Sequence, residues 1–512
     1  MVLFVPDFSN SQVLFNARVA ETLAKAGHDV TMVMISALVD RESSDVKIKD
    51  KVKIHKVDAS FGIKKADFEE RQRQFLFEDI PVWDSRFRER MDKMTLLLTE
   101  TCRKVVENKE FLNWLVLQKF DLAFSYMFDV CPIGLIHYAK IPSWIWLSTG
   151  GLLDHMAYYM GVPTIPSYVP TSLMDSTDQM DFVERVKSFV GHTLIIALWK
   201  RLFADRETEH FRRLIDPHFP DIVDIAKKCP LVMLNSNELY EAPRPTLSKI
   251  VNIGGVGVEF RDANTLPDEF LKVVNASVGL VVFSFGSVTP TYKMPLTWKK
   301  AFLDAFKHFP EHRFIMKYED TDLQGHLPSN VNMFKWLPQS DLLAHPKTKA
   351  FISHGGYNSI QEAIITGVPL VTIPLFGDQP KNAKWAEKHR IAVNLRKNSL
   401  TVDAIVNALE KILTDQSYTD NIKRLSRMVK KRPVKSEHLL VAWAEFVAEF
   451  KTLENLVPAG NNLNFFQYHS LDVIAFLFIL LISIVFVVYK LLLFVIAKLF
   501  RLLGHFWKQK KA

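Results

Sequence analysis

Apolar runs and amphipathic stretches alternate along most of the chain. Residues 2–6 form an apolar run, residues 11–27 place apolar side chains at helical spacing, and residues 29–35 form a second apolar run. A strand, a helix and a strand in this order predict a parallel βαβ unit at the start of the chain.

The same alternation continues in two successive regions. In the first region, further strands are expected at residues 120–124, 141–147 and 231–235. In the second region, strands are expected at residues 279–285, 312–317, 331–335, 350–353 and 369–374. A chain of 512 residues is too long for one hydrophobic core, so we predict two α/β domains with parallel sheets.

The segments between these strands differ in character. Residues 182–203 have the spacing of a long amphipathic helix. Residues 150–180 are rich in Pro, Gly, Ser and Tyr, so we expect loops that line a binding pocket. Residues 250–258 contain three glycines without the GxGxxG spacing, and we interpret them as the linker between the domains.

A continuous apolar run from residue 473 to 489 stands near the C-terminus. After Lys490 the apolar residues continue to Ala497. A membrane span needs roughly 20 apolar residues, so we predict a transmembrane helix at 472–497, with Lys490 reaching a headgroup or marking the end. The tail 498–512 is basic, which by the positive-inside rule puts it in the cytosol and the bulk of the chain in the lumen.

Two further features bear on location, and both leave alternatives open. The last residues, KQKKA, are typical of a dilysine retrieval signal for the endoplasmic reticulum or of a generic basic anchor. The sequon at Asn275 supports a lumenal location weakly. No basic, apolar leader precedes residue 2, so a signal peptide was removed or the sequence begins late, and we favour the second. Insertion as a tail anchor would instead leave the bulk in the cytosol.

Composition excludes some classes of function. The net charge of +8 is mild for this length and gives no nucleic-acid-binding patch. The three cysteines, Cys102, Cys131 and Cys229, have neither a disulfide framework nor metal-ligand spacing. We expect Cys131 and Cys229 to be packed thiols, because their neighbours are apolar.

The segment from Trp336 to Gln379 carries the strongest chemical signal. A predicted strand ends at His354-Gly355-Gly356, and a helix follows. The free N–H groups at such a helix start suit a diphosphate, and a His354 donor would add to them. Asn358 or Ser359 would cap the helix.

Other residues of this segment complete a nucleotide-sugar site. Trp336 offers a flat platform for a base, Gln339 an amide for its edge, and Glu362 a carboxylate for both ribose hydroxyls. Asp378 and Gln379 offer groups that bond sugar hydroxyls.

In this order and spacing, the residues resemble the nucleotide-sugar signature of the UDP-glycosyltransferase family, the membrane-bound detoxifying enzymes of animals. The resemblance covers nearly the whole chain. It implies a GT-B fold, with two Rossmann-like doubly wound domains facing each other plus a C-terminal transmembrane helix. It also implies a UDP-glucuronosyltransferase-like or glucosyltransferase-like enzyme of the endoplasmic reticulum. Ser287, in the strand-turn FSFGS, would contact a phosphate from the opposite side.

The resemblance also implies the boundaries of the domains. An acceptor-binding domain would occupy residues 1–245 and a UDP-sugar-binding domain residues 250–432. A helix at 433–455 would pack back on the first domain. Helix 182–203 would touch the membrane or, equally, pack on the first domain.

The expected reaction moves a sugar from UDP to a hydroxyl of a small lipophilic acceptor, with inversion. The UDP-sugar is a co-substrate, and no cofactor is expected. No metal is implied, because no DxD-like acidic pair flanks the site. Membrane lipid and a homo- or hetero-oligomer are further expected partners, and nucleic acid is not.

The catalytic half departs from the family pattern. The position of the family's basic histidine holds Gln12, and the position of its acidic partner holds Tyr126. A neutral amide does not accept a proton at working pH. Asp129 is the nearest carboxylate and a candidate substitute. Three alternatives remain. Acidic acceptors such as phenols would react without a strong base, or Asp129 would act as the base, directly or through water. In the third alternative, the protein binds UDP-sugar with little or no turnover.

Overall fold

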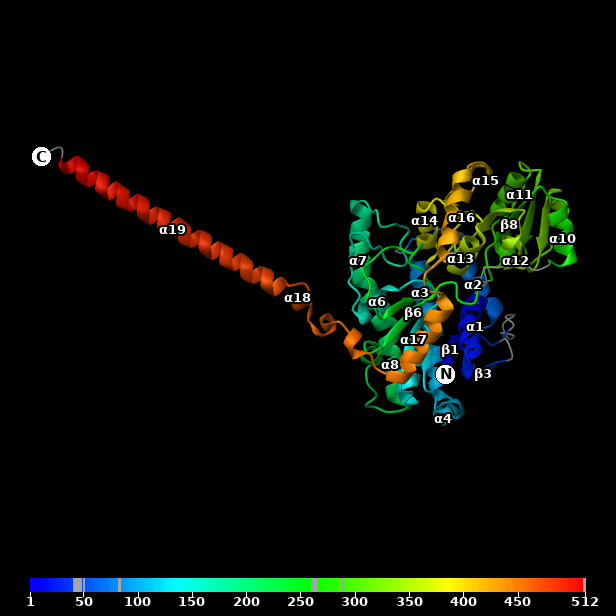
Figure 1. Ribbon diagram of the computed structural model, residues 1–512, viewed down its shortest axis with the longest axis horizontal. Coiled ribbons are helices and arrows are strands. Elements are labelled where there is room, and N and C mark those ends of the chain that lie inside the picture. Colours follow the sequence, from blue (N-terminus) through cyan, green and yellow to red (C-terminus); the bar gives the residue numbers. More distant parts are fainter. Residues whose placement is uncertain (40–47, 49–50, 82–83, 259–265, 288, 510–512) are drawn as a thin grey trace. The chain divides into compact units, whose positions relative to one another are not determined.

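The computed structural model describes residues 1–39, 48, 51–81, 84–258, 266–287 and 289–509 (Figure 1). The chain divides into two compact units, residues 1–456 and 457–512. The first unit contains both predicted sheets, and the second contains the apolar C-terminal helix.

The first sheet has seven parallel strands in the order β3-β2-β1-β4-β5-β6-β7. The strands are β1 (Val2–Pro6), β2 (Val30–Ser36), β3 (Val52–Asp58), β4 (Ala123–Ser125), β5 (Trp144–Ser148), β6 (Leu231–Leu234) and β7 (Ile250–Asn252). The strand order reverses between β1 and β4, which makes this point the topological switch of the sheet. The strands predicted at residues 2–6, 29–35, 120–124, 141–147 and 231–235 are confirmed, while β3 was not predicted.

Helices accompany this sheet between its strands. They are α1 (Asn10–Lys25), α2 (Lys65–Phe77), α3 (Ser85–Glu107), α4 (Lys109–Gln118), α5 (Cys131–Tyr138), α6 (Asp154–Met160), α7 (Phe182–Trp199), α8 (Asp205–Leu214) and α9 (Ile222–Ala226). Two predictions here were partly wrong. Residues 150–180 contain α6, whose apolar side chains pack into the core before Gly161 ends the helix at φ 79°. The predicted helix 182–203 changes to a π-helical turn at Lys200–Ala204.

The predicted linker 250–258 was also partly wrong. Ile250–Asn252 is the edge strand β7, paired with β6 through Val232 and Ile250. Val251 is buried, so this short apolar stretch extends the first sheet. The chain turns away only afterwards, where Gly255 and Gly257 have φ of 84° and 67°.

The second sheet has six parallel strands in the order β10-β9-β8-β11-β12-β13. The strands are β8 (Gly279–Ser284), β9 (His312–Lys317), β10 (Val331–Phe334), β11 (Thr348–Ser353), β12 (Leu370–Thr372) and β13 (Ala392–Asn394). All five strands predicted in this region are confirmed, and β13 is additional. The order reverses between β8 and β11, so the second switch point lies between their ends.

The helices of this region are α10 (Asp268–Asn275), α11 (Leu296–Phe306), α12 (Gln339–Ala344), α13 (Tyr357–Thr366), α14 (Gln379–Lys388), α15 (Val402–Thr414) and α16 (Gln416–Lys430). Two other helices link the halves of the first unit. The end of α2 packs into the core of the second sheet through Leu76 and Phe77. The Lys397 Nζ donates hydrogen bonds to the carbonyls of Leu76 and Leu375, at 3.3 and 2.7 Å. The later helix α17 (Ser436–Phe450) returns to the core of the first sheet.

The second unit consists mainly of α18 (Phe465–Tyr468) and α19 (Leu471–Gln509). Within α19, residues Leu471–Arg501 are long and apolar enough to cross a membrane. This agrees with the helix predicted at 472–497. The Lys510 and Lys511 of the retrieval motif lie outside the described residues.

Candidate active site

The candidate donor-site residues follow the carboxyl ends of the parallel strands β8, β10, β11 and β12. Ser287 follows β8 and is exposed, and the turn at His354 follows β11. Because β8 and β11 flank the second switch point, these two turns meet at the place where open α/β sheets bind ligands. The sequence-predicted residues are therefore brought to one edge of the second sheet.

The imidazole of His354 lies between two glycines that leave room for it. A Cβ on Gly356 would lie 2.4 Å from Nε2, and a Cβ on Gly286 would lie 2.9 Å from Cε1. Burial, and then the charge of Lys317, lowers the pKa of His354 to about 4. The ring is therefore neutral at pH 7, and its buried Nδ1 has no hydrogen-bond partner among the described residues. A neutral imidazole can donate one N–H to a phosphate oxygen.

The helix behind this turn is α13. Gly355 adopts φ 78° and Gly356 occupies the N-cap position without a side-chain cap. The predicted cap at Asn358 or Ser359 was therefore wrong, because the helix begins at Tyr357 and both residues lie inside it. The first N–H groups of α13 therefore carry the positive end of the helix dipole. The Asn358 Oδ1 accepts a hydrogen bond of 2.8 Å from Asn235 Nδ2, so this residue contacts the first sheet's side of the unit.

Trp336, Gln339 and Glu362 form a second group. Trp336 is 57% exposed, so its indole is accessible for stacking. The Gln339 Nε2 donates to Glu362 Oε2 at 2.8 Å. Gln339 therefore orients Glu362 in this structure, which sequence reasoning did not anticipate.

Asp378 and Gln379 begin α14. The Asp378 Oδ2 accepts from Asn382 Nδ2 at 2.8 Å, and burial raises the pKa of Asp378. The Gln379 Oε1 accepts from the backbone N–H groups of Leu375 and Phe376, at 2.8 and 3.0 Å. The side-chain carbonyl of Gln379 is thus used internally.

The catalytic candidates meet at the switch point of the first sheet. Gln12 lies in the first turn of α1, after β1, and Tyr126 and Asp129 follow β4. The buried Gln12 Oε1 has no hydrogen-bond partner within the described residues. Burial raises the pKa of Tyr126 well above its usual value. The phenol is therefore neutral and hydrogen-bonds to Asp129.

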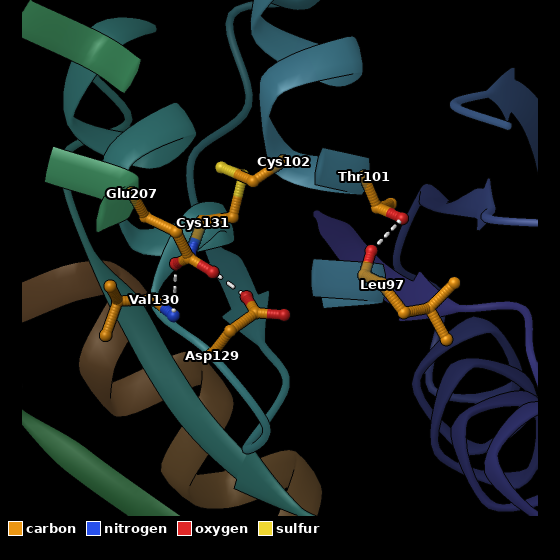
Figure 2. The surroundings of a disulfide bond; sticks show 7 residues. All are labelled: Leu97, Thr101, Cys102, Asp129, Val130, Cys131 and Glu207. Atoms are coloured by element: carbon orange, nitrogen blue, oxygen red, sulfur yellow. Dashed lines mark hydrogen bonds between the residues drawn. A yellow bond between two sulfur atoms is a disulfide. The ribbon is translucent and has the colours of Figure 1, made fainter. Parts of the chain in front are cut away.

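Asp129 has a second carboxylate beside it that sequence reasoning missed (Figure 2). The Asp129 Oδ1 accepts from the Cys131 N–H at 3.0 Å, and Glu207 Oε2 accepts from the Val130 N–H at 3.0 Å. Burial raises the pKa of Asp129 to about 7. Burial, and then the charge of Asp129, raises the pKa of Glu207 well above its usual value. At neutral pH the pair therefore holds at least one proton.

The cysteine prediction was wrong at Cys131. Cys102, in α3, and Cys131, at the start of α5, form a disulfide with a Cα–Cα distance of 5.7 Å (Figure 2). The two residues are 29 positions apart, and only the packing of α3 near the start of α5 brings them together. Cys229 is a buried free thiol, as expected.

Three contributors to the site were missed because they are distant in sequence. Lys317, at the end of β9, donates to the Gly286 carbonyl at 2.9 Å, and its Nζ lies 5.8 Å from the centre of the Trp336 ring. Arg18 contacts Glu362 across 344 positions, and Glu207 reaches Val130 across 77. Of these three residues, only Lys317 could have been identified from the sequence, because it ends a predicted strand and ligands bind beyond the carboxyl ends of such strands. Across the described ranges, no cluster of three or more His, Cys, Asp or Glu side chains is arranged to hold a metal ion.

Similar solved structures identify the fold. A UDP-glucosyltransferase from Polygonum tinctorium superposes with a TM-score of 0.57 at 16% identity, covering 88% of this chain and 97% of that one. The Phytolacca americana UGT2, complexed with UDP-2fluoro-glucose and pterostilbene, superposes with a TM-score of 0.56 at 14% identity, covering 88% and 99%. The fold is that of the GT-B glycosyltransferases, which confirms the predicted fold class.

Sequence comparisons then define the family. The model of the UDP-glucoronosyl and UDP-glucosyl transferase family matches residues 1–505. The mouse UDP-glucuronosyltransferase 1A7 is 35% identical over 399 residues, which cover 77% of this chain and 73% of the relative. A putative UDP-glucuronosyltransferase of Caenorhabditis elegans, ugt-48, is 29% identical over 489 residues, covering 93% and 90%. The chain belongs to the UDP-glycosyltransferase family, and the predicted resemblance is confirmed.

Proposed function

We propose that this glycosyltransferase moves a sugar from a UDP-sugar to a hydroxyl of a small lipophilic acceptor, with inversion and without a metal ion. Residues 1–245 would bind the acceptor and residues 250–432 the donor. The observation that carries the proposal is the neutral imidazole of His354, set between Gly286 and Gly356 at the start of α13.

The donor half would stabilise the leaving diphosphate. His354 donates one N–H, and the free N–H groups of α13 add the helix dipole, so negative charge is met without a cation from outside. The exposed ring of Trp336 stacks on uracil, and Glu362 accepts the ribose hydroxyls. Ser287 contacts a phosphate from the β8 turn, and Asp378 with the amide of Gln379 binds the sugar.

The acceptor half would work with weak base assistance. Gln12 does not take a proton, and the protonated carboxyl pair near Asp129 takes one only above its raised pKa. Acceptors that are already acidic, such as phenols, therefore react best. A catalytically weak or inactive UDP-sugar-binding relative is the second candidate function, favoured by Gln12 and Tyr126 in the family's base and acid positions.

A radiolabelled UDP-sugar assay with a phenol and an aliphatic alcohol separates these two functions. Transfer to the phenol supports the enzyme, and release of UDP without any glycoside supports only hydrolysis. Gln12→His restores an imidazole at the base position, so it should raise transfer to the alcohol more than transfer to the phenol. An unchanged ratio would contradict the base-poor mechanism.

The sugar follows from a direct comparison of donors. The similar mammalian proteins are named as UDP-glucuronosyltransferases, whereas the Polygonum tinctorium structure is that of a UDP-glucosyltransferase. Titration of UDP-glucuronic acid against UDP-glucose on the same protein decides which sugar the site prefers.

We infer a single-pass protein of the endoplasmic reticulum membrane, with the first unit lumenal and the basic tail cytosolic. Disulfides persist in oxidising compartments, so the bond between Cys102 and Cys131 favours the lumen. Asn275 is exposed at the end of α10, where a glycan would be tolerated. A loss of mass on deglycosylation, absent in Asn275→Gln, would support this topology. An unglycosylated Asn275 would favour the tail-anchored cytosolic alternative.

A further inference from the structure

Arg18 reaches from the first sheet's helix α1 to the donor-site helix α13. Its Nη2 lies 3.5 Å from Glu362 Oε1, and the two side chains are 18% and 8% exposed. Glu362 is the residue that we propose accepts the ribose hydroxyls. A largely buried cation from the other half of the unit therefore stands at the ribose position.

The chain leaves space for this arginine. A Cβ on Gly257 would lie 2.9 Å from the Cβ of Arg18 and 3.0 Å from its Cγ. Gly257 also has φ 67°, a conformation that residues with side chains rarely adopt. The segment after β7 thus carries no side chain at the point where the arginine stem passes.

The two oxygens of Glu362 have different partners. Oε2 accepts the short hydrogen bond from Gln339, at 2.8 Å, while Oε1 faces the longer contact with Arg18. A carboxylate oxygen has two lone pairs, so Oε1 retains capacity for a hydroxyl donor. Arg18 therefore supports the charge and direction of the carboxylate without filling its acceptor positions.

Other contacts hold the rest of α13 against the first sheet's side, and two of them are between neutral groups. Gln361 Nε2 donates to the Asn235 carbonyl at 2.7 Å, and Asn235 Nδ2 donates to Asn358 at 2.8 Å. These bonds fix the helix as a whole. The Arg18 contact acts on the one carboxylate that faces the ribose, so its loss should affect ribose recognition more than helix placement.

We propose that Arg18 is a positioning residue of the ribose subsite, which orients Glu362 toward the two hydroxyls of the nucleotide. The proposal rests on the proposed function, because it requires that this site holds UDP. The first domain then takes part in recognising the donor, although the base and the diphosphate are bound by the second.

The test compares UDP with 2′-deoxy-UDP, which lacks one of the hydroxyls that Glu362 would accept. Both nucleotides are titrated calorimetrically into the full-length protein and its Arg18→Gln variant. Arg18→Gln should weaken the binding of UDP about tenfold, the loss expected for one charge-assisted hydrogen bond. It should weaken the binding of 2′-deoxy-UDP only about threefold, because that nucleotide keeps only one of the two hydroxyls that Glu362 would accept. A purely structural role would weaken both nucleotides equally.

Three further variants make the result specific. Arg18→Lys keeps the charge and should recover most of the preference for UDP. Lys25→Gln removes an exposed charge from the last turn of the same helix and should change neither affinity. Glu362→Gln should abolish the preference by itself, and Arg18→Gln added to it should weaken UDP little further, because the two residues act as one unit.

The outcomes separate the two proposals. If the unmodified protein binds neither nucleotide, the proposed function fails and this inference with it. If it binds UDP, and Arg18→Gln leaves the affinity unchanged, tightens it or weakens both nucleotides equally, only the role of Arg18 is overturned. Should Arg18→Gln fold poorly, Arg18→Lys and Glu362→Gln still test the preference.

Discussion

Removing the disulfide should lower the stability of the first unit by a predictable amount. Cys131→Ser breaks the disulfide between α3 and α5, whose two cysteines, Cys102 and Cys131, are 29 positions apart in the sequence. The entropy of the unfolded chain then rises, and for a loop of this length the chain-entropy relation gives a loss of about 3.5 kcal/mol. Cys102→Ser should cost the same, because it opens the same loop.

This free energy converts to a melting temperature. The entropy of unfolding is roughly 2.1 cal/mol/K per residue, so it is about 1 kcal/mol/K for a unit of 456 residues. Dividing the lost free energy by this entropy gives a decrease in melting temperature of about 4 °C. The assay is thermal unfolding of the detergent-solubilised protein at one scan rate, with and without a reductant. The reductant should lower the melting temperature of the unmodified protein by a similar amount and leave Cys131→Ser unchanged.

Cys229 supplies the matched control. Its thiol is buried and free, so Cys229→Ala should keep the full response to reductant. The reasoning is refuted if mass spectrometry shows the bond reduced while the melting temperature stays constant. It is also refuted if Cys229→Ala removes the response as completely as Cys131→Ser does.

Four other substitutions test the donor and catalytic halves. Because the pKa of Asp129 is raised by burial to about 7, the folded chain binds a proton that the unfolded chain has released above about pH 4. Its contribution to the free energy of unfolding is full at low pH and is lost as pH rises through 7. The melting temperature of Asp129→Asn should therefore decrease less between pH 5 and pH 8 than that of the unmodified protein. His354→Ala should weaken UDP about ten- to a hundredfold in a calorimetric titration, and Gly356→Ala should do the same by placing a methyl 2.4 Å from Nε2. UDP affinity unaffected by either change would contradict the assigned diphosphate site. Trp336→Ala should raise the Kd for UDP about tenfold and leave that for pyrophosphate unchanged, since stacking involves only the base. An equal loss for both ligands would argue against a base platform.

The strands were predictable where they are fully buried. Apolar runs such as β1, β8 and β11 need no partner to be recognised, because both faces of a parallel sheet are covered. The strand β3 was missed because its lysines and its histidine alternate with few apolar residues on an edge. The strand β13 was missed because it is a short edge strand in which only Ala392 is buried.

The candidate donor-site residues could be proposed from the sequence because one short segment carries most of them. Trp336, His354 and Glu362 follow one another with little intervening chain, in an order and spacing that resemble the family's nucleotide-sugar signature. Glu207 and Arg18 act through contacts 77 and 344 positions away, and no local pattern reports such a distance. The disulfide was missed for the same reason.

The docking of α2 has a mechanical consequence. Its end is embedded beside the second sheet and held there by Lys397, although the flanking strands β3 and β4 belong to the first sheet. The polypeptide also passes between the sheets after β7 and again before α17. Any opening of one half against the other must therefore bend the backbone at all of these places together. We therefore expect donor exchange to involve a small rotation that bends all of these segments together, not a large rotation about a single hinge.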